Sequence, residues 1–459
     1  MTIPNHVFRE YDIRGFVGKE LTDDFAYTLG RAYATLAKDK KKNNIAIGWD
    51  CRLSSEGFAN ALSKGLSDEG IDVQLTGMGP TPQLYYAIFS GDLGGGIQVT
   101  GSHNPPDMNG FKICLGKETL SGKDIQDIKQ RALKLSPSAS ATKKGAIKSV
   151  LMRDSYTAQL IENSKPYIGK RKLKVVVDGG NGVGGLVGPQ ALKSLGVDVI
   201  ELFCDPDGNF PNHHPDPTEL KNLTALIAKV KETKADFGIG WDGDADRIGV
   251  VDENGEVIYG DMLLLLFARE ILKTVPHPTV IGDVKCSSLL FNDLKKRGAN
   301  AIMWKTGHSL IKHKLKETSG DLAGEMSGHI FFKHRYFGFD DAMYASLRFI
   351  EIVSNTDLQV SKLLSDLPKM VSTPEIRADC PEEIKFKILE KAQKAFSDFT
   401  VDSLDGVRIS FEHGWGIVRA SNTQPVLVMR FEAENKKDLE AYRALVTTRI
   451  DAIKAEFQR

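Results

Sequence analysis

The sequence predicts an α/β protein built from three related α/β units followed by a C-terminal α+β unit. Short apolar runs that end in Gly or Asp alternate with stretches of helical periodicity, which is typical of parallel sheets with crossover helices. This alternation occurs three times, and the last part of the chain has neighbouring antiparallel strands instead. A length of 459 residues is too long for one ordinary core and predicts two to four domains.

Each of the three units is predicted to begin with a buried strand that ends in Asp and to close with a strand that runs into a polar, glycine-containing loop. The predicted strands are 45–50, 72–75 and 96–100 in the first unit, 173–178, 197–202 and 237–241 in the second, and 279–283, 299–303 and 322–325 in the third. The predicted helices lie near 54–69, 81–89, 184–195, 219–233, 287–297 and 309–318. Because ligands bind beyond the carboxyl ends of strands in open α/β sheets, the three closing loops are expected to face one shared cleft.

The C-terminal unit is predicted to contain a largely antiparallel sheet. Its expected elements are a helix near 382–396, strands at 406–412, 415–420 and 426–432, and a charged helix from Lys437 onward. The expected domain limits are 1–148, 149–253, 254–367 and 368–459.

Composition limits the kinds of partner. Lysine plus arginine and aspartate plus glutamate number 60 each, so no overall charge favours nucleic acid or an acidic membrane. The N-terminus lacks the pattern of a signal peptide, and apolar runs such as 262–268 are too short to span a bilayer. The five cysteines are scattered and form no CxxC pair, which favours a reducing cytoplasm over a disulfide framework or a zinc site.

The strongest chemical motif is the run from Trp241 to Arg247, which contains Asp242, Asp244 and Asp246 on a loop after a buried strand. Three carboxylates at alternate positions repel one another unless a cation lies between them, and hard oxygen ligands suit Mg²⁺. An EF-hand calcium loop is an alternative because Glu253 occupies the twelfth position, but Arg247 replaces the glycine of position six and the flanks resemble strands. A solvated acidic turn is the remaining alternative.

A second motif is the segment 100–106, in which Ser102 lies between Gly101 and His103. A serine on a loop at the end of a strand can be a nucleophile or a phosphate carrier, although the segment alone is also typical of an ordinary turn. Other residues suit phosphate and sugar binding. They are a C-terminal group of Arg419, Ser421, Asn422 and Thr423, an acid–hydroxyl–imidazole group of Glu325, Ser327 and His329, and Lys112, Lys285 and His308 at or just after predicted strand-end loops.

With these motifs in this order, the chain resembles the α-D-phosphohexomutase superfamily over nearly its whole length. The resemblance rests on segments 8–15, 100–105, 242–247, 324–329 and 419–423. It implies four domains around a central cleft, three of related mixed-sheet α/β topology and a fourth of the α+β kind. The departures are small: Ala245 replaces a common glycine, and Gly101 replaces a common alanine. Both are small residues in turns, so no change of chemistry is expected.

The resemblance also implies a role for each matching residue. Ser102 would be the phosphoserine, and Asp242, Asp244 and Asp246 would hold one Mg²⁺ together with its phosphate, which Arg247 would help to grip. Tyr11 and Arg14 match residues near the reacting end of the sugar, and Lys112 and His329 match proposed acid/base residues. Lys285 and His308 match residues of the cleft, Glu325 and Ser327 match the sugar-specificity loop, and Arg419, Ser421, Asn422 and Thr423 match a clamp for the non-reacting phosphate.

The function implied is reversible transfer of phosphate between C6 and C1 of a hexose phosphate, mannose or glucose, through a hexose 1,6-bisphosphate that serves as intermediate and activator. The partners implied are small hexose phosphates, with no nucleic acid and no membrane, and a monomer or weak homodimer is expected. Three alternatives remain open: a phosphoglucosamine mutase, a metal-dependent phosphatase with an aspartyl nucleophile, and a non-catalytic sugar-phosphate binder.

Overall fold

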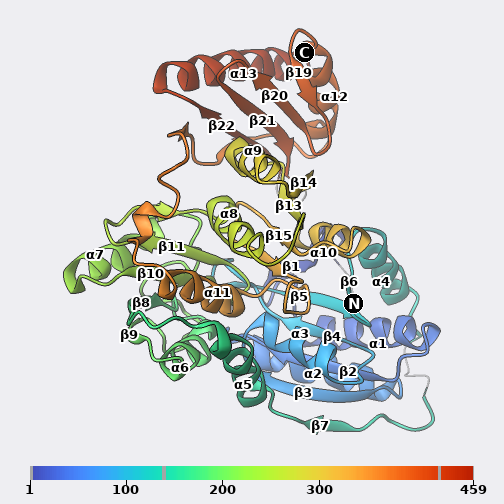
Figure 1. Ribbon diagram of the computed structural model, residues 1–459. Helices are drawn as coiled ribbons and strands as arrows, with labels where there is room; N and C mark the ends of the chain where they lie inside the picture. The colour runs from blue at the N-terminus through green and yellow to red at the C-terminus, as the bar shows by residue number, and fades with distance from the viewer. Residues whose placement is uncertain (1–3, 137–140, 422–424, 458–459) are drawn as a thin grey trace.

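The computed structural model describes residues 4–136, 141–421 and 425–457. The chain forms four sheets in succession, each with its own helices, and these are called domains 1 to 4 in chain order (Figure 1). The first three have mixed sheets flanked by helices and the fourth has an antiparallel sheet, so the predicted fold class is confirmed.

Domain 1 contains a seven-stranded sheet of order β1-β5-β4-β2-β3-β7, with β6 paired to β5. Its strands are β1 (Ile13–Phe16), β2 (Asn44–Trp49), β3 (Asp72–Met78), β4 (Gly95–Val99), β5 (Met108–Leu115), β6 (Glu118–Thr119) and β7 (Ile147–Ser149). Its helices are α1 (Asp23–Asp39), α2 (Ser55–Asp68), α3 (Thr81–Ser90) and α4 (Lys123–Leu133). The predicted elements correspond to β2, α2, β3, α3 and β4, whereas α1 and β5 were not among them.

Domains 2 and 3 repeat this design with fewer strands. Domain 2 consists of α5 (Arg153–Ser164), β8 (Lys174–Asp178), α6 (Gly188–Ser194), β9 (Asp198–Leu202), α7 (Thr224–Thr233), β10 (Phe237–Trp241), β11 (Ile248–Asp252) and β12 (Val257–Ile258). Domain 3 consists of α8 (Gly260–Ile271), β13 (Thr279–Asp283), α9 (Ser288–Lys296), β14 (Asn300–Trp304), α10 (His308–Glu317), β15 (Leu322–Gly324), β16 (Ile330–Phe332) and α11 (Ala342–Ser354). The helices predicted near 184–195 and 219–233 each begin with a short 3₁₀ turn before α6 and α7.

The three α/β sheets share one topology. Strands β2, β8 and β13 each lie between two parallel neighbours, and the parallel strands β4, β10 and β15 each pair with an antiparallel strand that follows in sequence, namely β5, β11 and β16. Each predicted closing loop therefore joins a parallel strand to an antiparallel one. This pairing explains why the three loops are short and why both of their ends are anchored in a sheet.

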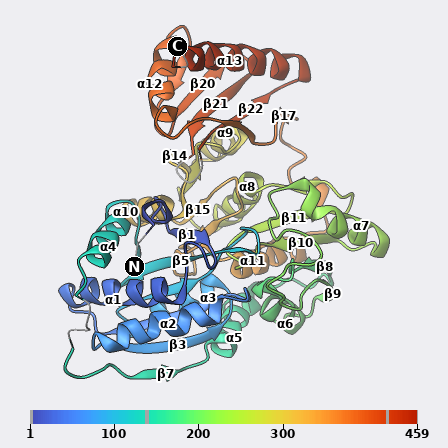
Figure 2. The same cartoon turned by 180° about the vertical axis from the view of Figure 1, so that it is seen from behind.

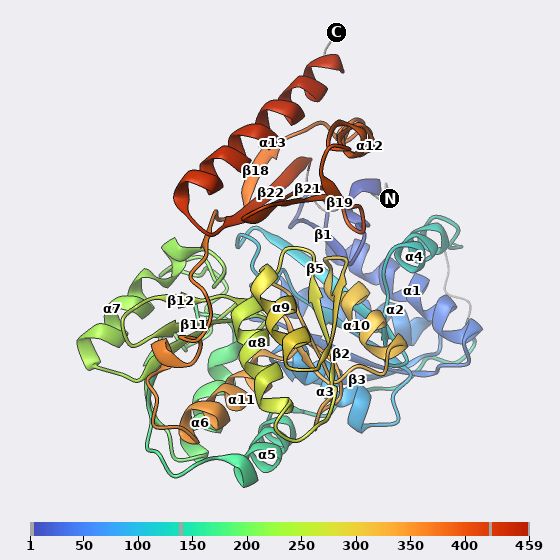
Figure 3. The same cartoon turned by 45° about the horizontal axis from the view of Figure 1, so that its top comes forward.

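Domain 4 is built from an antiparallel sheet of order β17-β22-β21-β20-β19, with β18 also paired to β22. Its elements are β17 (Val371–Ser372), β18 (Ile376–Asp379), α12 (Lys385–Ala395), β19 (Thr400–Asp402), β20 (Val407–Phe411), β21 (Gly414–Ala420), β22 (Val426–Ala433) and α13 (Lys436–Glu456). Figures 2 and 3 show this domain at one end of the molecule with a coil leading into it, and Figure 2 shows it beside α9 of domain 3.

The hydrophobic cores reflect this arrangement. One large core includes side chains from α3 of domain 1, the sheet of domain 2, and α8 and α11 of domain 3. Domain 4 has a separate core between its sheet and the helices α12 and α13. The apolar run at 262–268 lies in α8, and no helix within the described ranges is long and apolar enough to cross a membrane.

Candidate functional site

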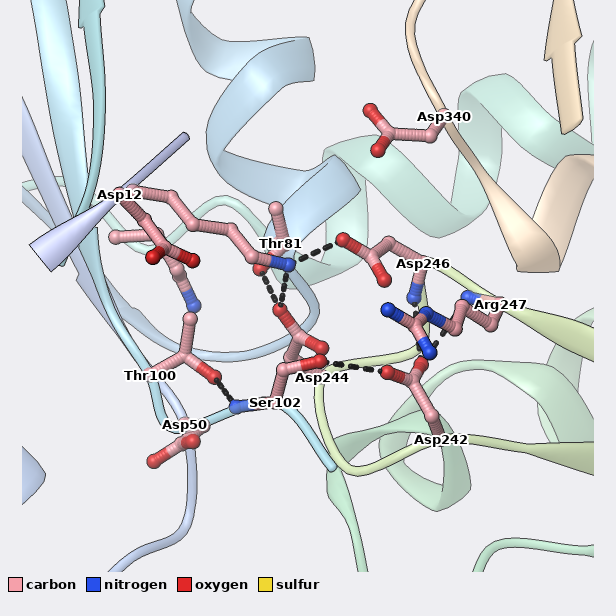
Figure 4. Close-up of polar contacts among 12 residues, drawn as sticks. Asp12, Asp50, Thr81, Thr100, Ser102, Asp242, Asp244, Asp246, Arg247 and Asp340 are labelled. Atoms are coloured by element: carbon pink, nitrogen blue, oxygen red, sulfur yellow. Dashed lines mark hydrogen bonds and ion pairs between the residues drawn. The ribbon is translucent and has the colours of Figure 1, made fainter. Parts of the chain in front are cut away.

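Ser102 lies on the loop between β4 and β5 with its side chain buried. Its Oγ donates a hydrogen bond of 2.8 Å to Asp242 Oδ2, and its backbone N–H donates to Thr100 Oγ1 at 2.8 Å (Figure 4). His103 Nδ1 also lies 3.2 Å from the same Oγ. The φ angle of Ser102 is +49°, a left-handed conformation that is uncommon for a residue with a side chain and that is often found at functional sites.

A buried arginine holds this loop in place. Arg52, just beyond β2, donates from Nη1 to the carbonyls of Pro105 and Met108 at 2.6 and 2.9 Å. Its Nη2 donates to the carbonyls of Ser102 and Asn104 at 2.8 and 2.5 Å. A guanidinium presents five donors in a rigid fork, so one side chain satisfies four carbonyls of an irregular loop.

In domains 1 and 3, the aspartate that ends the predicted opening strand binds the loop after the closing strand. Asp50 Oδ2 accepts the N–H of Gly101 at 3.2 Å in domain 1, and Asp283 Oδ1 accepts the N–H of Met326 at 3.2 Å in domain 3. In domain 2, Asp178 Oδ1 instead accepts the N–H of Gly180 at 2.9 Å. The aspartate loop is held there by the N–H of Val183, which donates to the carbonyl of Gly243 at 3.1 Å. The pattern repeat noted in the sequence therefore positions loops as well as strands.

The aspartate loop connects β10 to β11, and all three of its carboxylates are buried. Asp242 Oδ1 accepts the N–H groups of Asp246 and Arg247 at 3.0 and 3.1 Å, which closes the loop on itself. Ala245 has φ +56°, which explains why glycine suits this position. Because both flanks are strands, the EF-hand alternative is wrong.

The buried charges of this loop are compensated in part by Lys112. Its Nζ donates to Asp244 Oδ2 at 2.6 Å and also contacts Asp246 Oδ2, while Thr81 Oγ1 donates to Asp244 Oδ2 at 2.5 Å. Lys112 lies within β5, the strand that directly follows the loop carrying Ser102. It faces the site because β5 is the antiparallel neighbour of β4.

The pKa values follow from these contacts. Burial, and then the neighbouring carboxylates Asp244 and Asp246, raise the pKa of Asp242 well above its usual range. Burial alone would also raise the pKa of Asp244, but the ion pair with Lys112 outweighs it and lowers that pKa. Burial would lower the pKa of Lys112, and the surrounding aspartates raise it instead.

The donor set fits a small divalent cation. Oxygens of Asp242, Asp244 and Asp246 lie within 4.8 Å of one another. In the described part of the chain, Asp244 Oδ1 and Asp246 Oδ1 are buried and have no hydrogen-bond partner. Buried carboxylate oxygens without a donor are costly, and oxygen-only donors in a polar setting match what Mg²⁺ prefers.

The third closing loop meets the aspartate loop. Arg247 Nε donates to His329 Nε2 at 2.9 Å, and the two residues also form an isolated β-bridge. The His308 ring stacks on that of His329 with centroids 5.7 Å apart, and Tyr11 contacts His308 edge-on. Arg14 Nη1 donates to Oδ1 of Asn104, in the loop that carries Ser102, at 3.2 Å. Burial, followed by Lys312, lowers the pKa of His308 well below its usual range.

Glu325 and Ser327, which the resemblance matches to a sugar-specificity loop, lie next to this group. Glu325 Oε1 accepts the N–H of Gly307 at 2.6 Å, and burial raises the pKa of Glu325. Ser327 lies in the same turn between β15 and β16. Lys285 Nζ forms an ion pair of 2.6 Å with Glu375 of domain 4, a partner that the sequence did not suggest.

Arg419 connects domain 4 to the rest of the site. Its Nη2 donates to Asp405 Oδ2 at 3.0 Å, and the same oxygen accepts the N–H of Thr306 at 3.0 Å. The carbonyl of Thr306 in turn accepts from the hydroxyl of Tyr11 in domain 1 at 3.0 Å. Ser421 follows β21, whereas Asn422 and Thr423 lie outside the described residues. Residues from domains 1, 3 and 4 are thus joined by one chain of hydrogen bonds.

Several residues of the site were not singled out from the sequence. They include Arg52, Thr81, Asp340, Glu375 and Asp405. Two of these had a local signal: Arg52 follows a strand that ends in Asp, and Thr81 begins a helix with Pro82 in its first turn. The other three are defined only by contacts across domains or between distant loops.

Comparison with protein families gives four matches in chain order. Residues 5–138, 154–255 and 259–371 match the models of phosphoglucomutase/phosphomannomutase α/β/α domains I, II and III. Residues 375–448 match the model of the C-terminal domain of the same family.

Relatives match the chain from end to end. A phosphomannomutase/phosphoglucomutase of Pseudomonas putida is 45% identical over 460 residues, covering 99% of this chain and 98% of the relative. A phosphoglucomutase of Neisseria gonorrhoeae is 45% identical over 443 residues, covering 96% and 95%. The crystal structure of a phosphoglucomutase/phosphomannomutase family protein from Burkholderia thailandensis is 40% identical, with a TM-score of 0.91 and coverage of 99% and 98%.

Proposed function

Since the chain belongs to the phosphoglucomutase/phosphomannomutase family, we propose that it moves phosphate between C6 and C1 of glucose or mannose phosphates through a phosphorylated Ser102. The observation that carries this proposal is the contact between Ser102 Oγ and Asp242 at 2.8 Å, beside two carboxylates with unpartnered oxygens. A phosphate on this Oγ would share a bound cation with those carboxylates.

The reaction consists of two transfers. A sugar hydroxyl oxygen bonds to the phosphorus of phospho-Ser102 while the bond from phosphorus to Oγ breaks, which leaves a hexose 1,6-bisphosphate and free Ser102. The sugar then turns in the cleft, and Oγ takes the other phosphate in the reverse sense. His329 and Lys112 are the groups we propose to take up and return the hydroxyl proton, because both lie within the same cluster.

Mg²⁺ is the cofactor we propose, held by Asp242, Asp244, Asp246 and the serine phosphate. When bound, it offsets negative charge on the transferring phosphate. Two arginines of the chain are proposed to act beside this cation. Arg247 grips the serine phosphate, and Arg52 keeps the loop that carries Ser102 in place.

The substrate is proposed to bind between this cluster and domain 4. Tyr11, Arg14, Lys285 and His308 would line the cleft, Glu325 and Ser327 would bind sugar hydroxyls, and Arg419, Ser421, Asn422 and Thr423 would clamp the phosphate that does not react. Because the bisphosphate must turn end for end, domain 4 has to open, and the linker near 367–373 is the proposed hinge.

We keep the domain limits 1–148, 149–253, 254–367 and 368–459 as part of the proposal. The matched family segments begin and end close to them, which supports the division. We also propose that the enzyme works in the cytoplasm as a monomer or weak homodimer.

Intact-mass measurement and phosphopeptide mapping test the proposal. After incubation of the full chain with glucose 1,6-bisphosphate, one phosphate is expected on Ser102, with Mg²⁺-dependent conversion of glucose 1-phosphate and mannose 1-phosphate. Ser102→Ala should abolish both results, whereas Ser90→Ala, which removes a hydroxyl at the end of α3, should keep them. Turnover that survives in Ser102→Ala would indicate an aspartyl-nucleophile phosphatase, binding without turnover would indicate a sugar-phosphate binder, and preference for glucosamine 6-phosphate would change the sugar.

A further inference from the structure

Thr81 is the first residue of α3, and it joins domain 1 to the aspartate loop of domain 2. Thr81 and Asp244 are both fully buried. The Thr81 N–H donates to the carbonyl oxygen of Asp244 at 2.9 Å, and Thr81 Oγ1 donates to Asp244 Oδ2 at 2.5 Å (Figure 4). A threonine at the start of a helix commonly caps that helix, whereas this hydroxyl binds a carboxylate of another domain.

The hydrogen bonds of Asp244 leave one of its two side-chain oxygens for a cation. Asp244 Oδ2 accepts two hydrogen bonds, because Lys112 Nζ also donates to it at 2.6 Å. A carboxylate oxygen has about two lone-pair sites, so both sites of Oδ2 are filled. Asp244 Oδ1 is buried and has no hydrogen-bond partner among the described residues. Asp244 is therefore arranged to bind a cation through Oδ1 alone.

Asp242 is restricted in the same way by the backbone. Its Oδ1 accepts the N–H groups of Asp246 and Arg247 at 3.0 and 3.1 Å, while its Oδ2 accepts from Ser102 Oγ at 2.8 Å. Asp242 is thus also arranged to offer one oxygen. The difference is that backbone groups of its own loop fill Asp242 Oδ1, whereas two side chains of domain 1 fill Asp244 Oδ2.

We propose that Thr81 is a specificity-determining residue for the metal, whose hydroxyl restricts Asp244 to one coordinating oxygen and so favours Mg²⁺ over Ca²⁺. This inference rests on the proposed role of the three aspartates as metal ligands. Mg²⁺ demands near-octahedral geometry, whereas Ca²⁺ takes about six to eight oxygens and accepts carboxylates that bind through both oxygens. A free lone pair on Asp244 Oδ2 would therefore add a ligand for Ca²⁺ without serving Mg²⁺.

Three variants isolate the hydroxyl. Thr81→Val removes the donor and keeps the shape of the side chain, and the hydrogen bond from its N–H to the Asp244 carbonyl can still form. Thr81→Ser keeps the hydroxyl and should behave like the wild type. Thr76→Val is the matched control, because Thr76 is another buried threonine of domain 1, whose hydroxyl donates to the carbonyl of Ile47 at 3.2 Å.

Isothermal titration calorimetry of the full chain with MgCl₂ and with CaCl₂ gives the two dissociation constants, with all proteins unphosphorylated by intact mass. The ratio of the Ca²⁺ Kd to the Mg²⁺ Kd should fall by about 10- to 100-fold in Thr81→Val. It should stay near the wild-type value in Thr81→Ser and Thr76→Val. Infrared difference spectra of Ca²⁺-loaded Thr81→Val should also show an added band of bidentate carboxylate coordination. A purely structural role of Thr81 would move neither readout.

An unchanged ratio in Thr81→Val, or an equal fall in Thr81→Ser, would overturn the inference. If Thr81→Val does not fold, the crystal structure of the wild type with Ca²⁺ decides. Coordination through Asp244 Oδ1 alone supports the inference, and coordination through both oxygens overturns it.

Failure of the proposed function has a different signature. A wild type that binds neither cation would remove the ligand assignment and this inference together. Activity that survives in Ser102→Ala would remove the phosphoserine mechanism but leave the effect of Thr81→Val on the two dissociation constants as predicted.

Discussion

Replacing Gly101 by alanine is the sharpest test of how the serine loop is held. The sequence alone suggests that alanine would be harmless there, because alanine often precedes the serine in the family that the chain resembles. In the structure, a Cβ atom on Gly101 would lie 2.5 Å from both Cζ and Nε of Arg52. The guanidinium is buried and bound to four loop carbonyls, so it cannot move aside without losing hydrogen bonds.

The magnitude follows from these contacts. Overpacking a filled site costs about 1–3 kcal/mol, and each hydrogen bond lost from a charged donor costs roughly 1.5–3 kcal/mol. Alanine also lowers the conformational entropy of the unfolded chain, which offsets about 0.4–1 kcal/mol of this cost. Gly101→Ala is therefore expected to lower the free energy of unfolding by about 2 kcal/mol. A displacement of Ser102 by roughly 1 Å would reduce kcat by about 10²-fold.

A double-mutant cycle with Arg52→Met measures the effect. Urea unfolding of the wild type, Gly101→Ala, Arg52→Met and the double variant should give a coupling free energy of about 2 kcal/mol, because the clash disappears once the guanidinium is gone. Gly57→Ala is the control: its Cβ would meet only Asp23 Oδ1, at 3.6 Å, so alanine should be neutral or slightly stabilising in helix α2. An equal cost of Gly101→Ala in both backgrounds, or no cost at all, would refute the reasoning.

Three further predictions concern the metal loop, a link between domains 2 and 3, and the contact of domain 4. Asp244→Asn should weaken Mg²⁺ binding and lower kcat by about 10²-fold or more, as measured by calorimetry and by Mg²⁺ titration of activity; unchanged Mg²⁺ affinity would contradict the ligand assignment. Ser346→Ala removes the acceptor of Trp241 Nε1, which lies 2.9 Å away, so urea unfolding should show a loss of about 1–3 kcal/mol with kcat unchanged, and no loss would mean that the indole N–H finds another partner. The Lys285 ammonium lowers the pKa of Glu375 from 4.5 to about 2. The ionised carboxylate therefore stabilises the folded state above pH 4.5, by at most about 3 kcal/mol. This stabilisation is lost as the pH falls from 4.5 to 2. The difference in unfolding free energy between the wild type and Glu375→Gln should shrink over that range, and a difference independent of pH would count against the ion pair.

The sequence predicted those parts of the site whose signal is local. Asp242, Asp244 and Asp246 are close in sequence, so their mutual repulsion can be inferred without a fold. Arg52 was missed because its importance comes from carbonyls about fifty residues later, which no periodicity reports. Strand β5 was missed too, so Lys112 was placed relative to the loop of Ser102 but was not assigned to a strand.

Tertiary packing accounts for the other gaps. Asp340 gains its partners only when α10, β16 and the aspartate loop come together. The pairing of Lys285 with Glu375 depends on how domain 4 docks on domain 3. The opening strands and closing loops were predicted because each α/β unit repeats one local pattern, and the antiparallel strands after the loops were not predicted because their pairing is set by the sheet.

The core that α3 shares with domains 2 and 3 has a consequence for synthesis on the ribosome. Tyr85 of α3 packs against Phe339, Tyr86 packs against Phe337, and Lys312, which donates to Tyr85, comes 227 residues after it. At about 5–20 residues per second, Phe339 is synthesised roughly 10 to 50 seconds after Tyr85, whereas Tyr156 of α5, which packs against Tyr86, follows earlier. A chain that stops before residue 337 therefore lacks Phe337 and Phe339 and leaves part of this aromatic face exposed, which favours aggregation. Domain 4 carries its own core and can complete its folding as a separate, final event.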